Sequence, residues 1–242
     1  MPSRLLNSLV DIVYPKTCVV CKNKLKTTAS VDNLICLECY GNIKRNLPPF
    51  CYSCGRHLEI FHSIKNICAD CLRRPLYFDR AFSPTRYEGV IKALIHEFKY
   101  KNKDYLGPIL GKLMTEFIKE YNLPMDKIDF IIPLPLHKTR LREREFNQAK
   151  ILSDYIASEF NKEVLNNKLM RSRYTKTQTE LEEDARLLNV KDSFSVTENK
   201  DIKGKIILLV DDVLTTGASC SEAACTLKKA GANIVFVLTL AN

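Results

Sequence analysis

Apolar residues in the last two thirds of the chain recur with the spacing of helices that alternate with strands. Within residues 90–101, Ile91, Leu94, Ile95 and Phe98 lie at helical spacing, which predicts a helix with one buried face. Unbroken apolar runs bounded by prolines or polar residues predict buried strands instead. On these grounds we expect helices over residues 104–121, 146–160 and 218–231, and strands over residues 81–89, 128–136, 203–210 and 233–241.

The alternation predicts the α/β class, with a parallel sheet flanked by helices. In sheets of this kind a ligand lies beyond the carboxyl ends of the strands. We therefore look for the chemistry of this part of the chain where its predicted strands end.

The first 71 residues have a different pattern, in which eight of the ten cysteines form four CxxC pairs. A CxxC knuckle turns two thiolates to one side, so two knuckles together complete a tetrahedral zinc site. Cross-braced knuckles, a disulfide framework and knuckles without metal are the alternatives to consecutive pairing. We assign two structural zinc ions, the first to Cys18, Cys21, Cys36 and Cys39, and the second to Cys51, Cys54, Cys68 and Cys71.

The change of pattern after Cys71 predicts two domains, residues 1–76 with a double zinc ribbon and residues 77–242 with the α/β fold. The ribbon domain begins with a short amphipathic helix that is too short and too charged to span a bilayer. No other apolar run approaches membrane length, so we expect a cytoplasmic protein without membrane insertion. We interpret His57 and His62 as surface residues, because each cysteine set is already complete, and Cys220 and Cys225 as core thiols.

Charge adds one indication about partners. The chain carries 37 basic and 28 acidic residues, a net charge of +9, and the excess is greatest in the first third. Such a balance favours a polyanion such as nucleic acid, although it also fits a role in solubility alone.

Residues 206–220, IILLVDDVLTTGASC, end a predicted strand with two carboxylates and continue through a turn into a helix. Backbone N–H groups of residues 215–219 and the helix dipole can cradle a phosphate there. Asp211 and Asp212 can accept hydrogen bonds from sugar hydroxyls or hold magnesium. An ordinary strand end capped by aspartate is the alternative. The candidate phosphate-binding residues are Thr215, Thr216, Gly217, Ala218 and Ser219.

This stretch resembles the binding motif of type I phosphoribosyltransferases, in which DD and TTG follow four apolar residues. The resemblance implies that Asp211 and Asp212 contact the ribose hydroxyls of phosphoribosyl pyrophosphate, and that residues 215–219 bind its 5-phosphate. It also implies magnesium as a companion of that ligand.

Residues 131–149, IIPLPLHKTRLREREFNQA, look like the strand and pyrophosphate loop of the ComF family of competence proteins. Glu145 departs from the family, which usually has glycine there, and a carboxylate would oppose pyrophosphate. The alternative is a solvated helix start in which Glu143 and Glu145 are the partners of the basic residues. The cations of this loop would be Lys138, Arg140, Arg142 and Arg144.

Residues 171–190 resemble the mobile flap and hood of the same fold, and a disordered linker is the alternative. Residues 87–100 are a further familiar segment, in which Lys99 is expected to face the site. The flap would include Arg171, Arg173 and Thr175, and the hood Gln178, Leu181, Arg186 and Asn189.

With the knuckles included, the resemblance to ComF proteins covers nearly the whole chain. It implies an accessory protein of natural transformation that binds phosphoribosyl pyrophosphate or a nucleotide, handles single-stranded DNA and has a ComFA-type helicase as a partner. An active phosphoribosyltransferase acting on an unidentified base or amine, and a zinc-built scaffold with a silent site, are the alternatives. Candidate DNA contacts are Lys22, Lys24, Lys26, Lys44 and Arg45, with Tyr40, Phe50 and Tyr52 for stacking.

Overall fold

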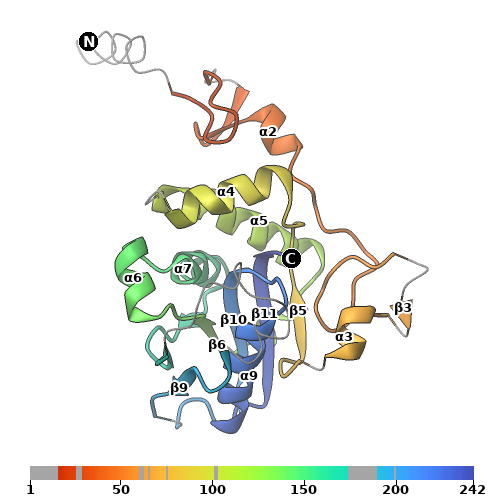
Figure 1. Cartoon of the computed structure of the whole chain (residues 1–242), viewed down its shortest axis with the longest axis vertical. Helices are drawn as coiled ribbons and strands as arrows, with labels where there is room; N and C mark the ends of the chain where they lie inside the picture. Colours follow the sequence, from red (N-terminus) through yellow and green to blue (C-terminus); the bar gives the residue numbers. More distant parts are fainter. Residues whose placement is uncertain are drawn as a thin grey trace.

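The computed structural model describes residues 16–25, 29–59, 63–64, 66–74, 76–100, 103–173, 190–198 and 200–242. Their central element is a five-stranded sheet in which every neighbouring pair of strands is parallel (Figure 1). The order across the sheet is β5 (Arg80–Phe82), β11 (Ile234–Ala241), β10 (Ile206–Val213), β6 (Phe130–Pro133) and β7 (Glu163–Val164). The predicted α/β class with a parallel sheet is confirmed.

Helices cover both faces of this sheet, because successive strand residues point to opposite sides. Leu208 and Ile131 face a core shared with three helices, whereas Leu209 and Ile132 face a second core on the other side. The three helices of the first core are α4 (Gly89–Tyr100), α5 (Gly107–Glu120) and α7 (Gln148–Phe160), and the helix of the second is α9 (Ala218–Lys229).

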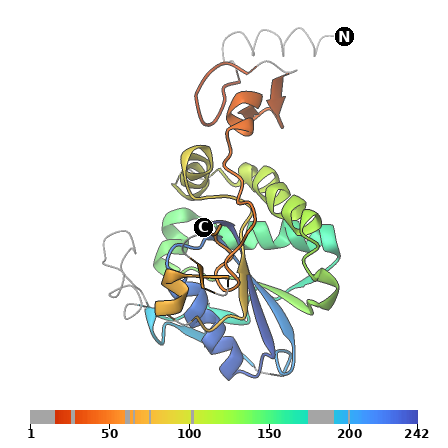
Figure 2. The same ribbon diagram turned by 90° about the vertical axis from the view of Figure 1, so that its right-hand side faces the viewer.

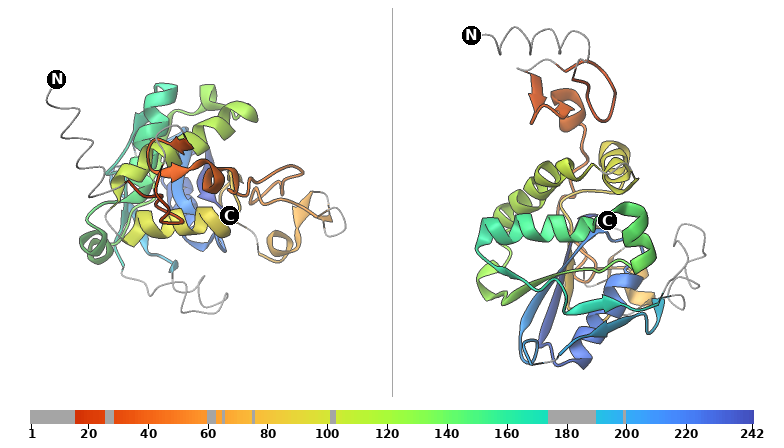
Figure 3. Two further views of the ribbon diagram at one scale, coloured as in Figure 1. Left: turned by 90° about the horizontal axis from the view of Figure 1, so that it is seen from above. Right: turned by 90° about the vertical axis from the view of Figure 1, so that its left-hand side faces the viewer.

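Helices α5 and α7 lie side by side (Figure 3), and two glycines explain how closely they approach. A Cβ atom added at Gly107 would lie 2.3 Å from Ile151, and one at Gly111 would lie 2.6 Å from the ring of Tyr155. The absence of a side chain at these two positions therefore sets the distance between the helices.

Each zinc ribbon is a short antiparallel strand pair followed by a one-turn helix. The first packs onto the core of α4 and α5, and the second onto the opposite core beside β5 (Figure 2). The first ribbon consists of β1 (Ser30–Val31), β2 (Ile35–Cys36) and α2 (Leu37–Gly41), and the second of β3 (Ser63–Ile64), β4 (Ile67–Cys68) and α3 (Ala69–Arg73).

Three features differ from the sequence prediction. Strand β10 continues to Val213, so Asp211 and Asp212 are its own residues and not the turn after it. The segment expected as a pyrophosphate loop is helix α6 (Lys138–Arg144). An unpredicted antiparallel pair, β8 (Leu169–Arg171) with β9 (Phe194–Val196), lies near α9. The remaining short elements are two 3₁₀ turns, η3 (Asp104–Leu106) and η4 (Met125–Lys127).

Candidate functional site

The thiols of the four knuckles gather into two groups, and in each group the four sulfur atoms lie within 4.8 Å of one another. The groups are those of consecutive knuckles, so the described residues do not form the cross-braced arrangement. Four thiolates around one position fit the closed tetrahedral site that structural zinc prefers. The two groups are Cys18, Cys21, Cys36 and Cys39, and Cys51, Cys54, Cys68 and Cys71, and they fit two structural zinc ions.

The two ribbons repeat the same local contact to a metal-ligand sulfur. In the first, the backbone N–H of Cys36 donates to Cys18 Sγ over 3.4 Å. In the second, the N–H of Cys68 donates to Cys51 Sγ over the same distance. Hydrogen bonds from the thiols of Cys54 and Cys71 further lower the pKa of Cys51. Such bonds favour the thiolate form that zinc requires.

The acid pair at the end of β10 is bound to a lysine of α4. Lys99 Nζ lies 2.7 Å from Asp212 Oδ1, and the two side chains are 17% and 9% exposed. Burial opposes the charge on Lys99, but attraction by Asp212, with a smaller contribution from Asp211, outweighs it and raises the pKa of Lys99. The expectation that Lys99 faces this site is confirmed.

Asp211 lies in a different environment from its neighbour. Burial and then repulsion by Asp212 raise the pKa of Asp211 to about 7, although Lys99 opposes the shift. One oxygen of Asp211 accepts the backbone N–H of Asp212 at 2.8 Å, and the other lies 3.9 Å from Cys220 Sγ. Burial, followed by the two carboxylates, raises the pKa of Cys220, so this thiol stays protonated and can donate. In this pair, Lys99 neutralises the charge of Asp212, whereas burial and repulsion by Asp212 disfavour the charged form of Asp211.

Three arginines of α6 and β8 lie near this acid pair or near the cations beside it. Burial and then repulsion by Arg140 lower the pKa of Arg171, whereas attraction by Asp211 opposes that shift. Because Arg140 is in α6, Arg171 in β8 and Asp211 in β10, these interactions show that the three elements lie close together at this place. Arg144 likewise repels Lys99 across the site. Together with Lys99 these side chains give this region four cations and two carboxylates, an excess that suits an anionic ligand.

Arg144 is the one member of α6 that is buried. Its guanidinium lies 5.2 Å from the centre of the Tyr100 ring and donates to Gln148 Oε1 over 3.2 Å. Lys138 and Arg142 are exposed on the outer side of the helix. The helix forms because His137 accepts the backbone N–H of Thr139 at its start and because its lysine, arginine, leucine and glutamate residues favour helix.

The FNQ segment, residues 146–148, has a structural role in this region. Asn147 accepts the N–H of Ala149 as the N-cap of α7 and donates to the Leu134 carbonyl over 3.0 Å. Phe146 packs against Phe98 with ring centres 5.6 Å apart. These contacts fix the end of β6 relative to α4 and thereby place Arg144 beside Lys99.

The turn between β10 and α9 leads from the acid pair into the N-terminus of a helix. Gly217 adopts a left-handed φ of 75°, caps α9 and accepts the N–H of Ser221 at 2.8 Å. Thr216 Oγ1 accepts the N–H of Ala218 at 3.4 Å. Thr215 and Thr216 lie in the turn itself, and Ala218 and Ser219 form the first turn of the helix, as predicted.

The flap is described only in part. Arg171 belongs to β8 and Arg173 follows it, whereas Thr175 and the predicted hood residues lie outside the described residues. The N-terminal helix, Lys26 and His62 lie outside them as well. The structure also shows two contacts that the sequence did not predict, the thiol of Cys220 beside Asp211 and the guanidinium of Arg56 beside the phosphate turn.

The predicted DNA contacts differ in how accessible they are. Phe50 packs edge-on against Tyr121 and Phe117, with ring centres 5.2 and 6.0 Å away, so its ring is part of the core. Lys22 forms an ion pair with Glu97 of α4. Tyr52 is 60% exposed and has the guanidinium of Arg80 5.0 Å from its ring centre.

Two family models match this chain. The double zinc ribbon domain matches residues 9–72, and the phosphoribosyl transferase domain matches residues 149–242. With the two four-cysteine groups and the parallel sheet, they define a protein that joins a double zinc ribbon to a phosphoribosyltransferase-like domain.

Similar proteins extend this result over the full length of the chain. Competence protein F of Haemophilus influenzae is 29% identical over 93% of this chain and 96% of its own. Competence protein ComFC of Bacillus subtilis is 29% identical over 86% and 84%. DNA utilization protein YhgH of Salmonella typhi is 28% identical over 95% and 98%. The two domain matches and these relatives together support a ComF family protein.

Solved structures match the chain only in part. The glutamine phosphoribosylpyrophosphate amidotransferase of B. subtilis is 18% identical, covers 57% of this chain and 26% of its own, and has a TM-score of 0.35. Adenine phosphoribosyltransferase of Leishmania donovani is 15% identical over 55% and 64%, also with a TM-score of 0.35. In the part of the chain that the structure describes, no helix has the length and apolar character to cross a membrane.

Proposed function

We propose that this protein is an accessory protein of natural transformation that binds phosphoribosyl pyrophosphate or a related nucleotide with magnesium and handles single-stranded DNA. The observation that carries the ligand is the cluster at the carboxyl edge of the sheet. There Lys99 pairs with Asp212, Arg171 lies near Asp211, and Arg140 and Arg144 lie near these two cations, beside the turn that leads into α9. A ligand with a pentose between a phosphate and a pyrophosphate matches this order of groups.

Different residues of the site would bind different groups of the ligand. The N–H groups of residues 215–219 would bind the 5-phosphate, and the carboxylates would accept hydrogen bonds from the ribose hydroxyls. Arg140 and Arg144 on α6, with Arg171, would hold the pyrophosphate. Lys138 and Arg142 on the outer side of the helix, and Arg173 and Thr175 of the flap, would meet the ligand as it enters.

Carboxylate oxygens are ligands that magnesium prefers, so the acid pair fits this ion. Because Lys99 already balances Asp212, Asp211 is the carboxylate that would hold magnesium together with oxygens of the ligand. Bound there, the ion would neutralise part of the charge on the pyrophosphate.

The role in transformation rests on the relatives, which are named competence and DNA utilization proteins. The DNA surface would include Tyr52 with Arg80, Lys44 and Arg45, because these side chains combine exposed rings with positive charge. A ComFA-type helicase would be the protein partner.

The ligand part is tested by replacing both carboxylates. In equilibrium dialysis with phosphoribosyl pyrophosphate and magnesium, Asp211→Asn with Asp212→Asn should bind more than tenfold more weakly than the unmodified chain. Cys225→Ser is the control, because it changes a residue of α9 and leaves both carboxylates in place, and it should bind phosphoribosyl pyrophosphate with normal affinity. Equal affinity in the double variant would show that the carboxylates do not contact the ligand.

The DNA part is tested by fluorescence anisotropy with a labelled single strand. Affinity should fall steeply between about 50 and 200 mM salt, because binding releases counterions. Neutralising Lys44, Arg45 and Arg80 should weaken binding, whereas neutralising Lys150 and Lys205, on other parts of the surface, should have little effect. Absence of binding at low salt would contradict this part of the proposal.

The match to the phosphoribosyl transferase domain favours a second candidate, transfer of ribose 5-phosphate to a base or amine. In that reaction the acceptor nitrogen bonds to the anomeric carbon, the bond to pyrophosphate breaks, and the cations stabilise the pyrophosphate that leaves. A screen of nucleobases and amines for magnesium-dependent pyrophosphate release separates the two candidates. Release above background with one acceptor would establish the transferase.

A further inference from the structure

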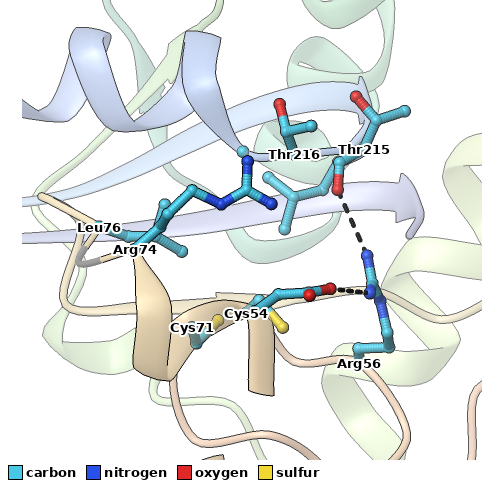
Figure 4. A pocket seen from close by; sticks show the side chains of 10 residues that line it. Cys54, Arg56, Cys71, Arg74, Leu76, Thr215 and Thr216 are labelled. Carbon is cyan, nitrogen blue, oxygen red and sulfur yellow. Dashed lines mark hydrogen bonds and ion pairs between the residues drawn. The ribbon is translucent and has the colours of Figure 1, made fainter. Parts of the chain in front are cut away.

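The second zinc ribbon lies directly behind the turn that we assign to the phosphate (Figure 4). A cavity of about 80 Å³ separates the two, with Arg56, Arg74 and Leu76 on the ribbon side and residues 214–217 on the side of the turn. These segments are far apart in the sequence, and the ribbon's own core continues into the core of α9. The ribbon is therefore placed to act on the turn.

Arg56 makes the direct connection. One guanidinium nitrogen donates to the backbone carbonyl of Thr215 over 3.3 Å, and another donates to Asp70 Oδ2 over 3.0 Å. Asp70 belongs to α3, between the zinc-ligand positions Cys68 and Cys71. One planar side chain thus links the metal-bound helix of the ribbon to the peptide of the turn, a geometry that arginine provides and lysine does not.

The direction of this hydrogen bond has a consequence for the next amide. The peptide between Thr215 and Thr216 is trans and planar, so its carbonyl and its N–H point in opposite directions. Because Arg56 holds the Thr215 carbonyl toward the ribbon, the Thr216 N–H is turned away from it. In Figure 4 the hydroxyl side chains of Thr215 and Thr216 extend away from the ribbon as well.

We infer that Arg56 is a positioning residue for the phosphate turn, and that the second zinc ribbon, through Asp70 and Arg56, is a working part of the sugar-phosphate site. Arg56 would not touch the ligand. It orients the Thr216 N–H toward the position of the phosphate before the ligand binds. Binding therefore does not have to order that peptide, and this entropic cost does not weaken the affinity. This inference rests on the proposed function for the identity of the ligand.

The inference is tested by titrating ribose 5-phosphate and, separately, pyrophosphate into variants by calorimetry. Arg56→Ala should bind ribose 5-phosphate about tenfold more weakly, because the peptide of the turn must then be ordered on binding, and should bind pyrophosphate unchanged. Asp70→Asn should show a smaller loss in the same direction. Arg86→Ala is the control, because it removes the same charge from an exposed side chain outside the ribbon and the site, and it should bind ribose 5-phosphate normally.

Two further measurements keep the result interpretable. Each variant should retain two zinc ions by metal analysis, which shows that the ribbon is still folded. Hydrogen exchange of the peptide that spans residues 211–219 should be faster in Arg56→Ala without any ligand, and Arg56→Lys should restore part of the protection.

The outcomes separate this inference from the proposed function. If the unmodified chain binds neither ligand, the proposed function fails, while the exchange rates still decide whether Arg56 orders the turn. Unchanged affinity together with unchanged exchange in Arg56→Ala would overturn the inference. If Asp70→Asn behaves like the unmodified chain, Arg56 orders the turn without Asp70, and the part of the inference that concerns Asp70 and α3 is wrong.

Discussion

Lys99 of α4 and Asp212 of β10 form a shielded ion pair, with 2.7 Å between the ammonium nitrogen and the carboxylate oxygen. The pair joins a helix of one core to the strand that carries the candidate site. Removing one partner of such a pair leaves the other charged and poorly solvated, which costs roughly 3–5 kcal/mol.

Lys99→Met should therefore lower the free energy of unfolding by about 3 kcal/mol in urea denaturation. Combining it with Asp212→Asn removes the stranded charge, so the double variant should recover most of the lost stability. Equal losses in the single and double variants would mean that the pair contributes through packing and not through charge.

Asp211 gives a pH dependence whose sign follows from its raised pKa of about 7. Between about pH 4 and 7 the folded chain keeps the proton that the unfolded chain has released, so this group makes stability fall as pH rises through that range. Asp211→Asn should be more stable than the unmodified chain at pH 8, by up to about 4 kcal/mol, and similar to it at pH 4. Urea denaturation at both pH values, without added magnesium, measures this difference. If Asp211→Asn is less stable than the unmodified chain at pH 8, the charged form of Asp211 does not destabilise the folded chain.

Glu145 occupies a left-handed backbone conformation, with φ of 66°, at the position where the resemblance to the ComF family implies glycine. Glycine adopts this conformation without strain. We expect Glu145→Gly to raise the free energy of unfolding by up to about 1 kcal/mol, because relief of strain exceeds the added freedom of the unfolded chain.

Glu145→Gln separates the charge from the backbone. If the carboxylate opposes pyrophosphate, both variants should bind phosphoribosyl pyrophosphate several-fold more tightly by calorimetry, while only the glycine variant gains stability. Unchanged affinity in both would show that this side chain points away from the ligand.

The pairing of the knuckles is tested by removing two thiols at once. Cys21 and Cys36 belong to one sulfur group, so replacing both with serine should leave one zinc ion of two by metal analysis. A cross-braced arrangement would lose both ions. Cys225→Ser, which removes a thiol outside the two groups, should keep both.

The elements that follow local rules were predictable from the sequence. The stripe of Ile91, Leu94, Ile95 and Phe98 is fully buried in α4, and Lys99 falls on the same face as Ile91 and Ile95, which is why it reaches the site. Both sulfur groups were also predictable, because each CxxC pair turns two thiols to one side and consecutive pairs lie close together in the sequence. The domain division at residue 76 stays a prediction.

Other features depend on contacts between distant parts of the chain. Arg56 and Thr215 are separated by 159 positions, and no periodicity connects them. Strands β8 and β9 are three residues long and pair across a long segment, so neither gives an alternating pattern of useful length. The basic segment was expected as a loop because of its resemblance to the pyrophosphate loop of ComF proteins, but its residue types and the His137 cap favour the helix that is found.

The central claim is that the carboxyl edge of the sheet binds a pentose between a phosphate and a pyrophosphate. Calorimetric titration of the zinc-loaded chain with phosphoribosyl pyrophosphate, with and without magnesium, tests it most directly. The account predicts one site per chain, tighter with magnesium and weaker below about pH 7, where Asp211 takes up a proton. No heat of binding at millimolar ligand with magnesium present would contradict it.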